Sequence, residues 1–262
     1  MKTNEQSNSE LSIKFDYDGI PAGYYDEIYH HGTPIRKAWH FLKFQRILEG
    51  IPRKVESIID IGSAAGTFLG QIPKTTIPEQ WGIDISLPQV KYANSKYETD
   101  FRRYHQVDLM DKAQCEQLLP KKVDCVSCIE VIEHLEWDVI NEIFGRAWEM
   151  LNVGGTFILS TPNYLSSWPV LEFIVNKLSS VDYEDQHITK FQYFNIINKL
   201  SKNIPDFKNK FDVDYVTTSH LLMPFTAGLS YKWSVSCSRV YHHRSWKFPF
   251  GNLIICALTK RG

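Results

Sequence analysis

The chain has 262 residues, with 29 Lys and Arg against 30 Asp and Glu, so its formal net charge is −1 at pH 7. A protein that binds nucleic acid by neutralising phosphates usually carries excess positive charge, so nucleic acid is not the expected partner. No apolar run approaches the roughly 18 to 20 residues of a membrane span, and the polar first twenty residues lack the apolar core of a signal peptide. The five cysteines are scattered. Together these features predict a soluble, cytoplasmic protein with free thiols.

The N-terminal part precedes any strand pattern. Residues 1–15 are polar and are expected to form a flexible tail. From Tyr24 to Leu48 the apolar and aromatic side chains approach helical spacing, which predicts one or two helices. We therefore expect a helical lid over residues 16–54, ahead of a single α/β domain over residues 55–262.

Short apolar segments then alternate with helical ones. The first four predicted strands each end in an acidic residue, and these acids follow one another at intervals of 24, 24 and 22 residues. That is the period of a strand–helix unit, and repeated units predict a doubly wound, Rossmann-like sheet of seven mostly parallel strands. Ligands of such sheets bind at the carboxyl ends of the strands. The predicted strands are 55–60, 80–84, 104–108, 123–130, 156–160, 211–217 and 253–259. The predicted helices between and after the first five strands are 67–71, 87–97, 112–119, 137–151, 168–178 and 191–200.

The segment between the last two predicted strands, residues 219–251, is long, aromatic and partly basic, and we expect a cap insertion there. Its basic residues, around His242–Arg244, favour either a phosphorylated substrate or a solvated face. Its apolar residues could line an acceptor pocket, touch a membrane surface or pack in the core. Peripheral membrane contact is therefore one open interpretation.

The turn after the first strand is rich in small residues. Gly62, Ala64 and Gly66 alternate there, which lets the backbone approach a ligand closely. The dinucleotide fingerprint would need a third glycine where Thr67 stands. Asp60, two residues before the first glycine, suits a ligand with an amino group and would repel a pyrophosphate. The turn therefore favours S-adenosylmethionine (SAM) over a dinucleotide.

The next two strand ends carry acids that extend such a site. Asp84 could accept two hydrogen bonds from a ribose diol, and Ile85 beside it could pack on an adenine. Asp108, followed by Leu109, could accept a hydrogen bond from the adenine amino group. Each acid alone would suit a solvated strand end. Their register with the glycine-rich turn favours a binding site.

These motifs occur in a specific order. They are Asp60–Gly66, Gly82–Ser86, Val107–Leu109, Glu130–Leu135 and Gly154–Asn163. In this order they resemble the class I SAM-dependent methyltransferases over about residues 55–200, and most of all the branch that contains the ubiquinone-pathway O-methyltransferases. Ala64 departs from the glycine usual in the family. The resemblance implies a SAM site formed by Asp60, Gly62, Ala64, Gly66, Asp84, Ile85, Asp108, Leu109 and Glu130, with Lys43 or Arg46 from the lid meeting the SAM carboxylate.

A second cluster, Glu130-x-x-Glu133-His134, follows the fourth predicted strand, and His187 lies in a later polar loop. In one interpretation these four residues bind Mg, Mn or Zn, which could hold and acidify a vicinal hydroxyl pair. Ubiquinone-pathway O-methyltransferases and small-RNA 3′-end 2′-O-methyltransferases resemble this arrangement, although Glu-His also occurs in family members without metal. In the other interpretation Glu130 contacts cofactor, Glu133 caps or pairs on the next helix, and His134 or His187 is the catalytic base.

The function that these motifs predict is a SAM-dependent methyltransferase (EC 2.1.1.-). We expect it to transfer a methyl group to oxygen or nitrogen of a small molecule, a glycan or a lipid-linked acceptor. Carbon methylation stays open, as do the acceptor and the oligomeric state. Two alternatives are a metal-dependent RNA 2′-O-methyltransferase, which the neutral charge balance opposes, and a SAM-binding protein without catalysis.

Overall fold

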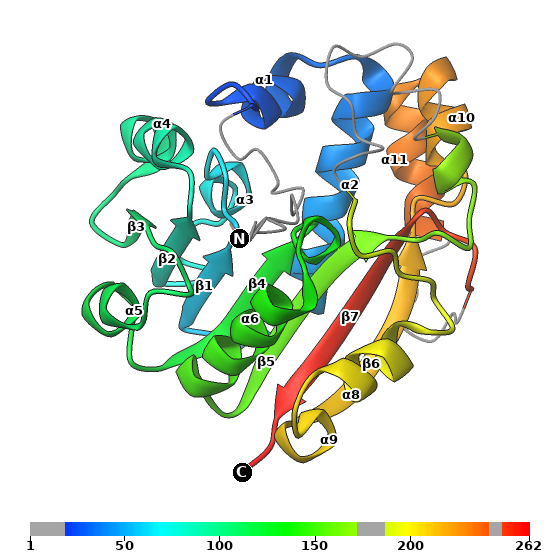
Figure 1. The fold of residues 1–262 in the computed structure, drawn as a ribbon. Helices are drawn as coiled ribbons and strands as arrows, with labels where there is room; N and C mark the ends of the chain where they lie inside the picture. Colours follow the sequence, from blue (N-terminus) through cyan, green and yellow to red (C-terminus); the bar gives the residue numbers. More distant parts are fainter. Residues whose placement is uncertain (1–18, 172–186, 241–247) are drawn as a thin grey trace, which may run out of the picture.

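A seven-stranded sheet forms the centre of the computed structural model, which describes residues 19–171, 187–240 and 248–262 (Figure 1). The strand order is β3-β2-β1-β4-β5-β7-β6. β7 runs antiparallel to β5 and β6, and the other pairings are parallel. The predicted Rossmann-like, mostly parallel sheet is confirmed. The strands are β1 (Ser57–Ile61), β2 (Glu79–Asp84), β3 (Arg102–Gln106), β4 (Val123–Ile129), β5 (Leu151–Pro162), β6 (Phe211–Ser219) and β7 (Leu253–Lys260).

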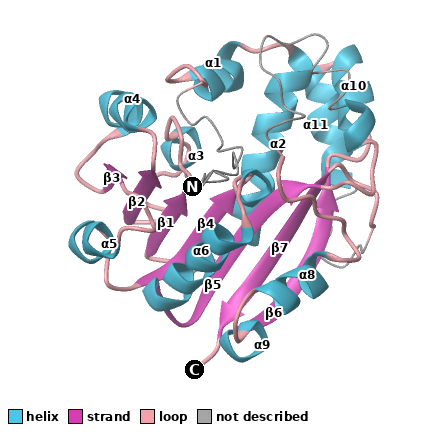
Figure 2. Cartoon of the chain, in the orientation of Figure 1, coloured by secondary structure: helices cyan, strands magenta, loops and turns pink. Residues whose placement is uncertain are grey.

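Helices cover both faces of the sheet (Figure 2). Several of their ends follow from local chemistry. Pro34 begins α2, where its missing N–H costs nothing. Asp111 caps α5 by accepting hydrogen bonds from the backbone N–H groups of Ala113 and Gln114. The helices are α1 (Tyr24–His31), α2 (Pro34–Gly50), α3 (Thr67–Gly70), α4 (Leu87–Tyr97), α5 (Lys112–Leu118), α6 (Trp137–Met150), α8 (Ile196–Asn203), α9 (Phe207–Lys210), α10 (Met223–Leu229) and α11 (Tyr231–Val240), with a 3-10 turn, η1, at Ile132–His134.

Two hydrophobic cores lie on opposite faces of the sheet. Successive strand side chains alternate between faces, so Ile58 and Ile59 of β1 belong to different cores. Ile58 packs with α2, α3 and α4 through residues such as Ile47 and Leu69. Ile59 shares its core with α5, α6, α8 and α9, where Phe144 is fully buried. The sheet is therefore covered on both sides, as a parallel sheet requires.

The predicted elements agree with the observed ones except at some ends. β3 ends at Gln106, so Asp108 lies in the following loop rather than at the strand end. The helix predicted over 191–200 begins only at Ile196. The predicted tail 1–15, most of the helix predicted over 168–178 and the His242–Arg244 group lie outside the described residues. Among the described residues, no helix combines the length and apolar character needed to cross a membrane.

Helix α1, part of the segment predicted as a lid, is fastened to α3 and α4 by one buried carboxylate. Asp26 is fully buried and accepts hydrogen bonds from Thr67 (2.8 Å), Tyr92 (2.9 Å), Tyr97 and Lys96. Burial raises the pKa of Asp26, but these donors outweigh that effect and leave the pKa below its ordinary value.

A second contact holds the segment just before α1. Gln89 of α4 accepts from the backbone N–H of Gly23 (3.1 Å), and its amide donates to the carbonyls of Ile20 and Pro21 (3.2 Å each). Helix α1 and the segment before it are thus each tied to α4 by a separate contact. We call these two contacts the lid latch.

Candidate functional site

A cavity of about 370 Å³ opens at the carboxyl ends of β1, β2, β4 and β5. The strand order reverses between β1 and β4, and such a switch point leaves a crevice because the following helices cover opposite faces. Predicted site residues that line the cavity are Lys43, Asp60, Gly62, Ala64, Asp84, Ile85, Asp108, Leu109, Glu130, Glu133, His134 and His187.

The small-residue turn after β1 forms one wall of this cavity. Gly62 (φ 72°), Ala64 (φ 45°) and Gly66 (φ 74°) all adopt left-handed backbone conformations. A Cβ on Gly62 would lie 2.5 Å from Val131, so no larger residue fits. Ala64 accepts strain that glycine would avoid. Gly66 does not line the cavity; its carbonyl accepts a hydrogen bond from the Tyr104 hydroxyl at 3.0 Å, which fixes the turn from behind.

Asp84 joins this turn to the end of β2. Its carboxylate accepts the backbone N–H of Ala64 at 2.8 Å and that of Ser86 at 2.9 Å. Burial raises the pKa of Asp84, and these two bonds oppose the rise. Ile85, which is 37% exposed, and Leu109 offer apolar surface to the same space.

No cationic side chain in the part of the chain that the structure describes hydrogen-bonds to Asp60. The side chain is 3% exposed and accepts from the Ser127 hydroxyl at 2.6 Å. Burial raises its pKa from 3.8 to about 7, against the opposing Ser127 bond. A ligand that brings a positive charge would stabilise the carboxylate form. The Asp60 carboxylate, as a buried hydrogen-bond acceptor, therefore fits the amino group of SAM.

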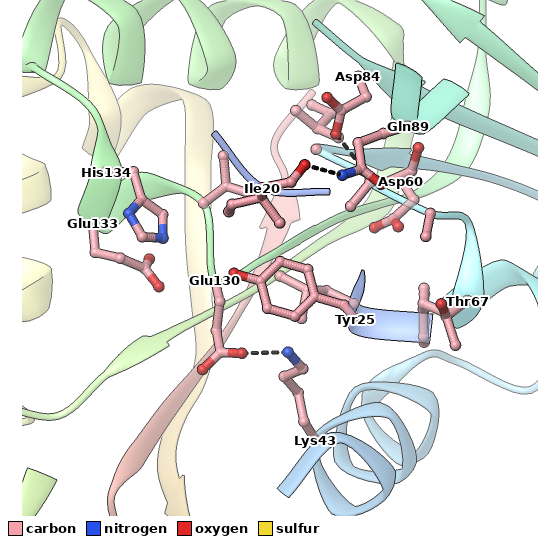
Figure 3. A pocket seen from close by; sticks show the side chains of 18 of the residues that line it. Ile20, Tyr25, Lys43, Asp60, Thr67, Asp84, Gln89, Glu130, Glu133 and His134 are labelled. Atoms are coloured by element: carbon pink, nitrogen blue, oxygen red, sulfur yellow. Dashed lines mark hydrogen bonds and ion pairs between the residues drawn. The ribbon is translucent and has the colours of Figure 1, made fainter. Parts of the chain in front are cut away.

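Lys43 and Glu130 face each other across the lid side of the cavity (Figure 3). Lys43 donates to the Glu130 carboxylate, and Trp39 donates to its other oxygen at 3.3 Å. Burial raises the pKa of Glu130, but the Lys43 ammonium outweighs burial and leaves the pKa below its ordinary value. Lys43 is thus engaged by a protein carboxylate, and Arg46 pairs with Glu49 without lining the cavity. Both side chains pair with carboxylates in this structure, and their contact with a SAM carboxylate stays a prediction.

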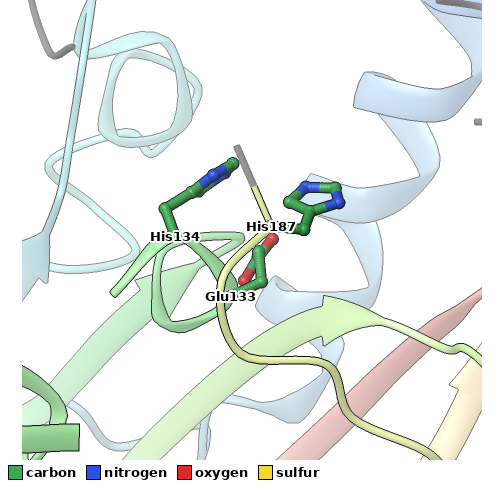
Figure 4. Close-up of side chains that lie close together, drawn as sticks. All are labelled: Glu133, His134 and His187. Carbon is green, nitrogen blue, oxygen red and sulfur yellow. The ribbon is translucent and has the colours of Figure 1, made fainter. Parts of the chain in front are cut away.

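Three of the four predicted metal ligands gather in one place, and Figure 3 shows two of them, Glu133 and His134, across the cavity from Asp60 and Asp84. Figure 4 shows Glu133, His134 and His187 around one point, and their candidate ligand atoms all lie within 4.8 Å of one another. Glu130 is not part of this group, because it is held by Lys43. The two imidazole rings lie 4.8 Å apart, and the Tyr164 hydroxyl contacts His187 Nδ1 at 2.7 Å. We call Glu133, His134 and His187 the base cluster.

Glu133 is the least satisfied polar group of the base cluster. It is 1% exposed, and among the described residues no hydrogen bond of good geometry reaches either carboxylate oxygen. Burial, reinforced by the charge of Glu130, raises its pKa well above the ordinary value, and the nearby Thr161 hydroxyl offsets only part of this. A buried, unpaired acid is costly to the fold. Such a group commonly serves a ligand, an ion or a reaction.

Aromatic side chains pack beside the base cluster in contacts that were not predicted from the sequence. Trp39 packs on Trp168 at 4.9 Å and on His220 at 4.5 Å. His220 is 2% exposed, lies 3.0 Å from the Trp39 carbonyl, and burial lowers its pKa to about 4. Gln89 was also missed. These contacts join residues far apart in the chain, so no local pattern indicates them.

The comparison with protein families decides the class. A family model described as "Methyltransferase domain" matches residues 35–203, which is more than half of the chain. The chain belongs to this family. The predicted class, a SAM-dependent methyltransferase with SAM as cofactor, is confirmed at the family level, whereas the ubiquinone-pathway branch stays a prediction. A search of curated proteins found no match to this sequence.

Solved methyltransferase structures share the fold at low identity. A SAM-dependent methyltransferase from Archaeoglobus fulgidus is 14% identical with a TM-score of 0.55, covering 90% of this chain and 99% of that one. Magnesium protoporphyrin IX methyltransferase from Synechocystis PCC 6803, solved with S-adenosylhomocysteine, is 16% identical with a TM-score of 0.55, covering 91% and 93%.

A third solved structure also holds a metal ion. Geranyl diphosphate C-methyltransferase from Streptomyces coelicolor A3(2), in complex with Mg²⁺, geranyl diphosphate and S-adenosylhomocysteine, is 12% identical with a TM-score of 0.56, covering 93% of this chain and 86% of that one. At such identities the likeness shows the fold alone.

Proposed function

We propose that this protein transfers a methyl group from SAM to an oxygen or nitrogen of a small-molecule, glycan or lipid-linked acceptor, with the base cluster taking the acceptor proton. This proposal rests on the observation that two different groups of side chains face each other across one cavity. The turn with Asp60 and Asp84 lies on one side, and the buried Glu133 with two histidines lies on the other.

The cofactor residues are assigned by chemical fit. Asp60 receives the amino group of SAM, since no cation among the described residues hydrogen-bonds to its buried carboxylate. Asp84 receives the ribose hydroxyls, Ile85 and Leu109 cover the adenine, and Asp108 accepts from its amino group. Bound SAM supplies an already activated methyl group, so the protein has to align the acceptor and accept its proton.

The base cluster supports transfer to a hydroxyl in particular. A hydroxyl becomes a strong nucleophile only when its proton is removed during the reaction, and an imidazole or carboxylate within hydrogen-bond reach can do this. His187 is 7% exposed and lines the cavity, and Tyr164 orients its ring. The proton then passes from the acceptor oxygen to His187, His134 or Glu133.

A divalent cation is a second candidate for the same cluster, because no described residue gives the buried Glu133 a hydrogen bond of good geometry. One carboxylate and two imidazoles suit Mg, Mn or Zn. A bound ion would lower the pKa of a coordinated hydroxyl. If a cation takes part in the reaction, we expect a chelator to abolish methyl transfer and one added metal ion to restore it. Activity that persists after complete chelation would show that the side chains act as bases without a metal ion.

The experiment that tests the proposal is incubation of the full chain with methyl-labelled SAM and fractionated cell extract. We expect label in a glycan, lipid or small-molecule fraction, bound through oxygen or nitrogen. Label in RNA would instead support the RNA 2′-O-methyltransferase alternative. SAM binding without S-adenosylhomocysteine formation in any fraction would support a non-catalytic protein and overturn the proposal.

A further inference from the structure

A set of exposed apolar side chains lies on the helices that cap the cavity. α10 and α11 pack together and against α2 (Figure 1). Their inner side is a small core of Met223, Ala227, Ala38 and Leu42. On these helices and the residue before α10, the outward apolar side chains, which we call the apolar face, are Ile35 (43% exposed), Leu222 (41%), Phe225 (66%), Leu229 (79%) and Trp233 (51%).

The apolar face is continuous from α2 to α10. Phe225 and Leu229 are four residues apart and share one side of α10. The position of a Cβ on Gly228 lies 4.0 Å from Ile35, so the two helices meet there. An exposed group of large apolar side chains on a soluble protein commonly marks a binding surface.

On the described residues of α10 and α11 the only charged side chains are cationic. From residue 215 to residue 262 the chain contains no Asp or Glu, although the whole chain has 30. On α2, α10 and α11 the single acid is Glu49, near the far end of α2 and paired with Arg46 at 2.7 Å. The exposed Lys232 precedes Trp233 on α11. Arg36 and Lys37, which follow Ile35, are half-buried and donate to the Tyr24 hydroxyl and the His30 carbonyl.

We infer that the apolar face docks on the surface of an anionic lipid bilayer. Aromatic and aliphatic side chains flanked by Lys and Arg are the combination that enters a lipid interface, and the cations meet the anionic headgroups. A second copy of the chain fits worse. A two-fold contact would bring the exposed Lys232 of both copies into one interface, where the described residues of α10 and α11 offer no carboxylate to pair with it.

Docking in this way brings the cavity to the lipid. Ile35 and Arg36 belong to the cavity lining, and Ile35 is also part of the apolar face. An acceptor carried in the bilayer would therefore meet the cavity at Ile35. This selects the lipid-linked class among the proposed acceptors, an assignment that rests on the proposed function.

The test is sedimentation of the full chain with vesicles, without SAM or acceptor. We expect binding to phosphatidylcholine mixed with phosphatidylglycerol in equal parts, weaker binding to phosphatidylcholine alone, and release by salt. The double variant Phe225→Ser and Leu229→Ser should lower vesicle binding roughly tenfold or more, because two buried apolar side chains are lost. The matched control is Phe194→Ser, a 68% exposed side chain just before α8 that should change nothing.

The outcomes separate this inference from the proposed function. Equal sedimentation of the wild type and the double variant, or no binding to the anionic vesicles, overturns membrane docking whatever the label experiment shows. A concentration-dependent dimer in light scattering that the double variant abolishes would assign the face to a second copy instead. Vesicle binding with no methyl transfer in any fraction would leave docking intact and remove the acceptor assignment. Unchanged SAM binding by the variants verifies that they are folded.

Discussion

The two sides of the cavity satisfy their polar groups in different ways. On the turn side, which comprises Asp60, the glycine-rich turn and Asp84, backbone N–H groups occupy the Asp84 carboxylate, and glycine positions are fixed by close contacts. On the cluster side, Glu133 is buried with no hydrogen bond of good geometry among the described residues. The turn side therefore holds Asp84 and the glycines in place by backbone contacts, whereas the cluster side keeps a buried acid without such contacts at the cost of stability.

This difference separates binding from chemistry. Groups already held by the backbone are preorganised, so they recognise a ligand without moving. An acid that lacks a partner gains one only when acceptor or cation arrives, so its interactions are available for the reaction. Variants on the turn side should change cofactor affinity, and variants on the cluster side should change turnover. Three substitutions test this separation of cofactor binding from turnover, and a fourth tests the lid latch.

The largest effect is expected for Glu133→Gln. The amide cannot accept a proton as a carboxylate does and is a poor ligand for a cation, so methyl transfer should fall about 100-fold or more. SAM affinity, measured by calorimetry, should stay unchanged because Glu133 belongs to the cluster side. Glu136→Gln, exposed in the same loop, is the matched control. A comparable loss of SAM affinity in Glu133→Gln would break the separation.

Asp26→Asn tests how much the buried carboxylate of the lid latch stabilises the fold. Asp26 accepts from hydroxyls of three residues and from Lys96, and an amide turns an NH₂ group toward some of these donors. We expect a loss of about 2 to 4 kcal/mol in the free energy of unfolding, measured with urea.

The pH dependence of this latch has a definite sign. The pKa of Asp26 is lowered in the fold, so its contribution is present above the unfolded pKa and is lost as pH falls through the folded value. The difference between wild type and Asp26→Asn should therefore shrink in acid. Asp100→Asn, which removes an exposed partner of Lys74, should change stability little at any pH. Equal losses in both variants would show that the latch does not hold the lid.

Asp84→Asn should weaken SAM binding about tenfold and leave the acceptor side untouched. Its amide would keep one of the two backbone bonds from Ala64 and Ser86 and would offer the ribose one acceptor fewer. Calorimetry with SAM measures the affinity, and Asp138→Asn, exposed at the start of α6, serves as control. A reduced turnover at saturating SAM would place Asp84 in the chemistry instead.

The same contrast explains what the sequence could predict. The turn side is local: Asp60 to Gly66 and Asp84 are positioned by their own strands, so periodicity and spacing indicated them. The cluster side is assembled over long separations. Gathering of Glu133 with His187 was expected only from the family resemblance, and the pairing of Lys43 with Glu130 was not expected. The Trp39–Trp168 contact and the Asp26 latch depend on tertiary packing, for which a single sequence carries no periodic signal.

Asp60→Asn gives the smallest effect and the most specific one, because it depends on pH. In the fold the Asp60 pKa is raised from 3.8 to about 7. Between these values the native state keeps a proton that the unfolded chain releases, so the wild type loses stability as pH rises through this window. The amide variant has no such loss. It should be more stable than the wild type at about pH 8 by on the order of 1 kcal/mol, less than the full shift implies because the Ser127 bond changes too.

Urea unfolding of both proteins between about pH 4 and pH 8 measures this difference, which should vanish at the acid end. SAM should act in the opposite direction. Its amino group stabilises the ionised Asp60, so at about pH 8 SAM should protect the wild type against unfolding more than it protects Asp60→Asn. If the stability of the two proteins changes in parallel with pH and SAM protects both equally, Asp60 does not bind a cation. The assignment of Asp60 to the amino group of SAM would then be wrong.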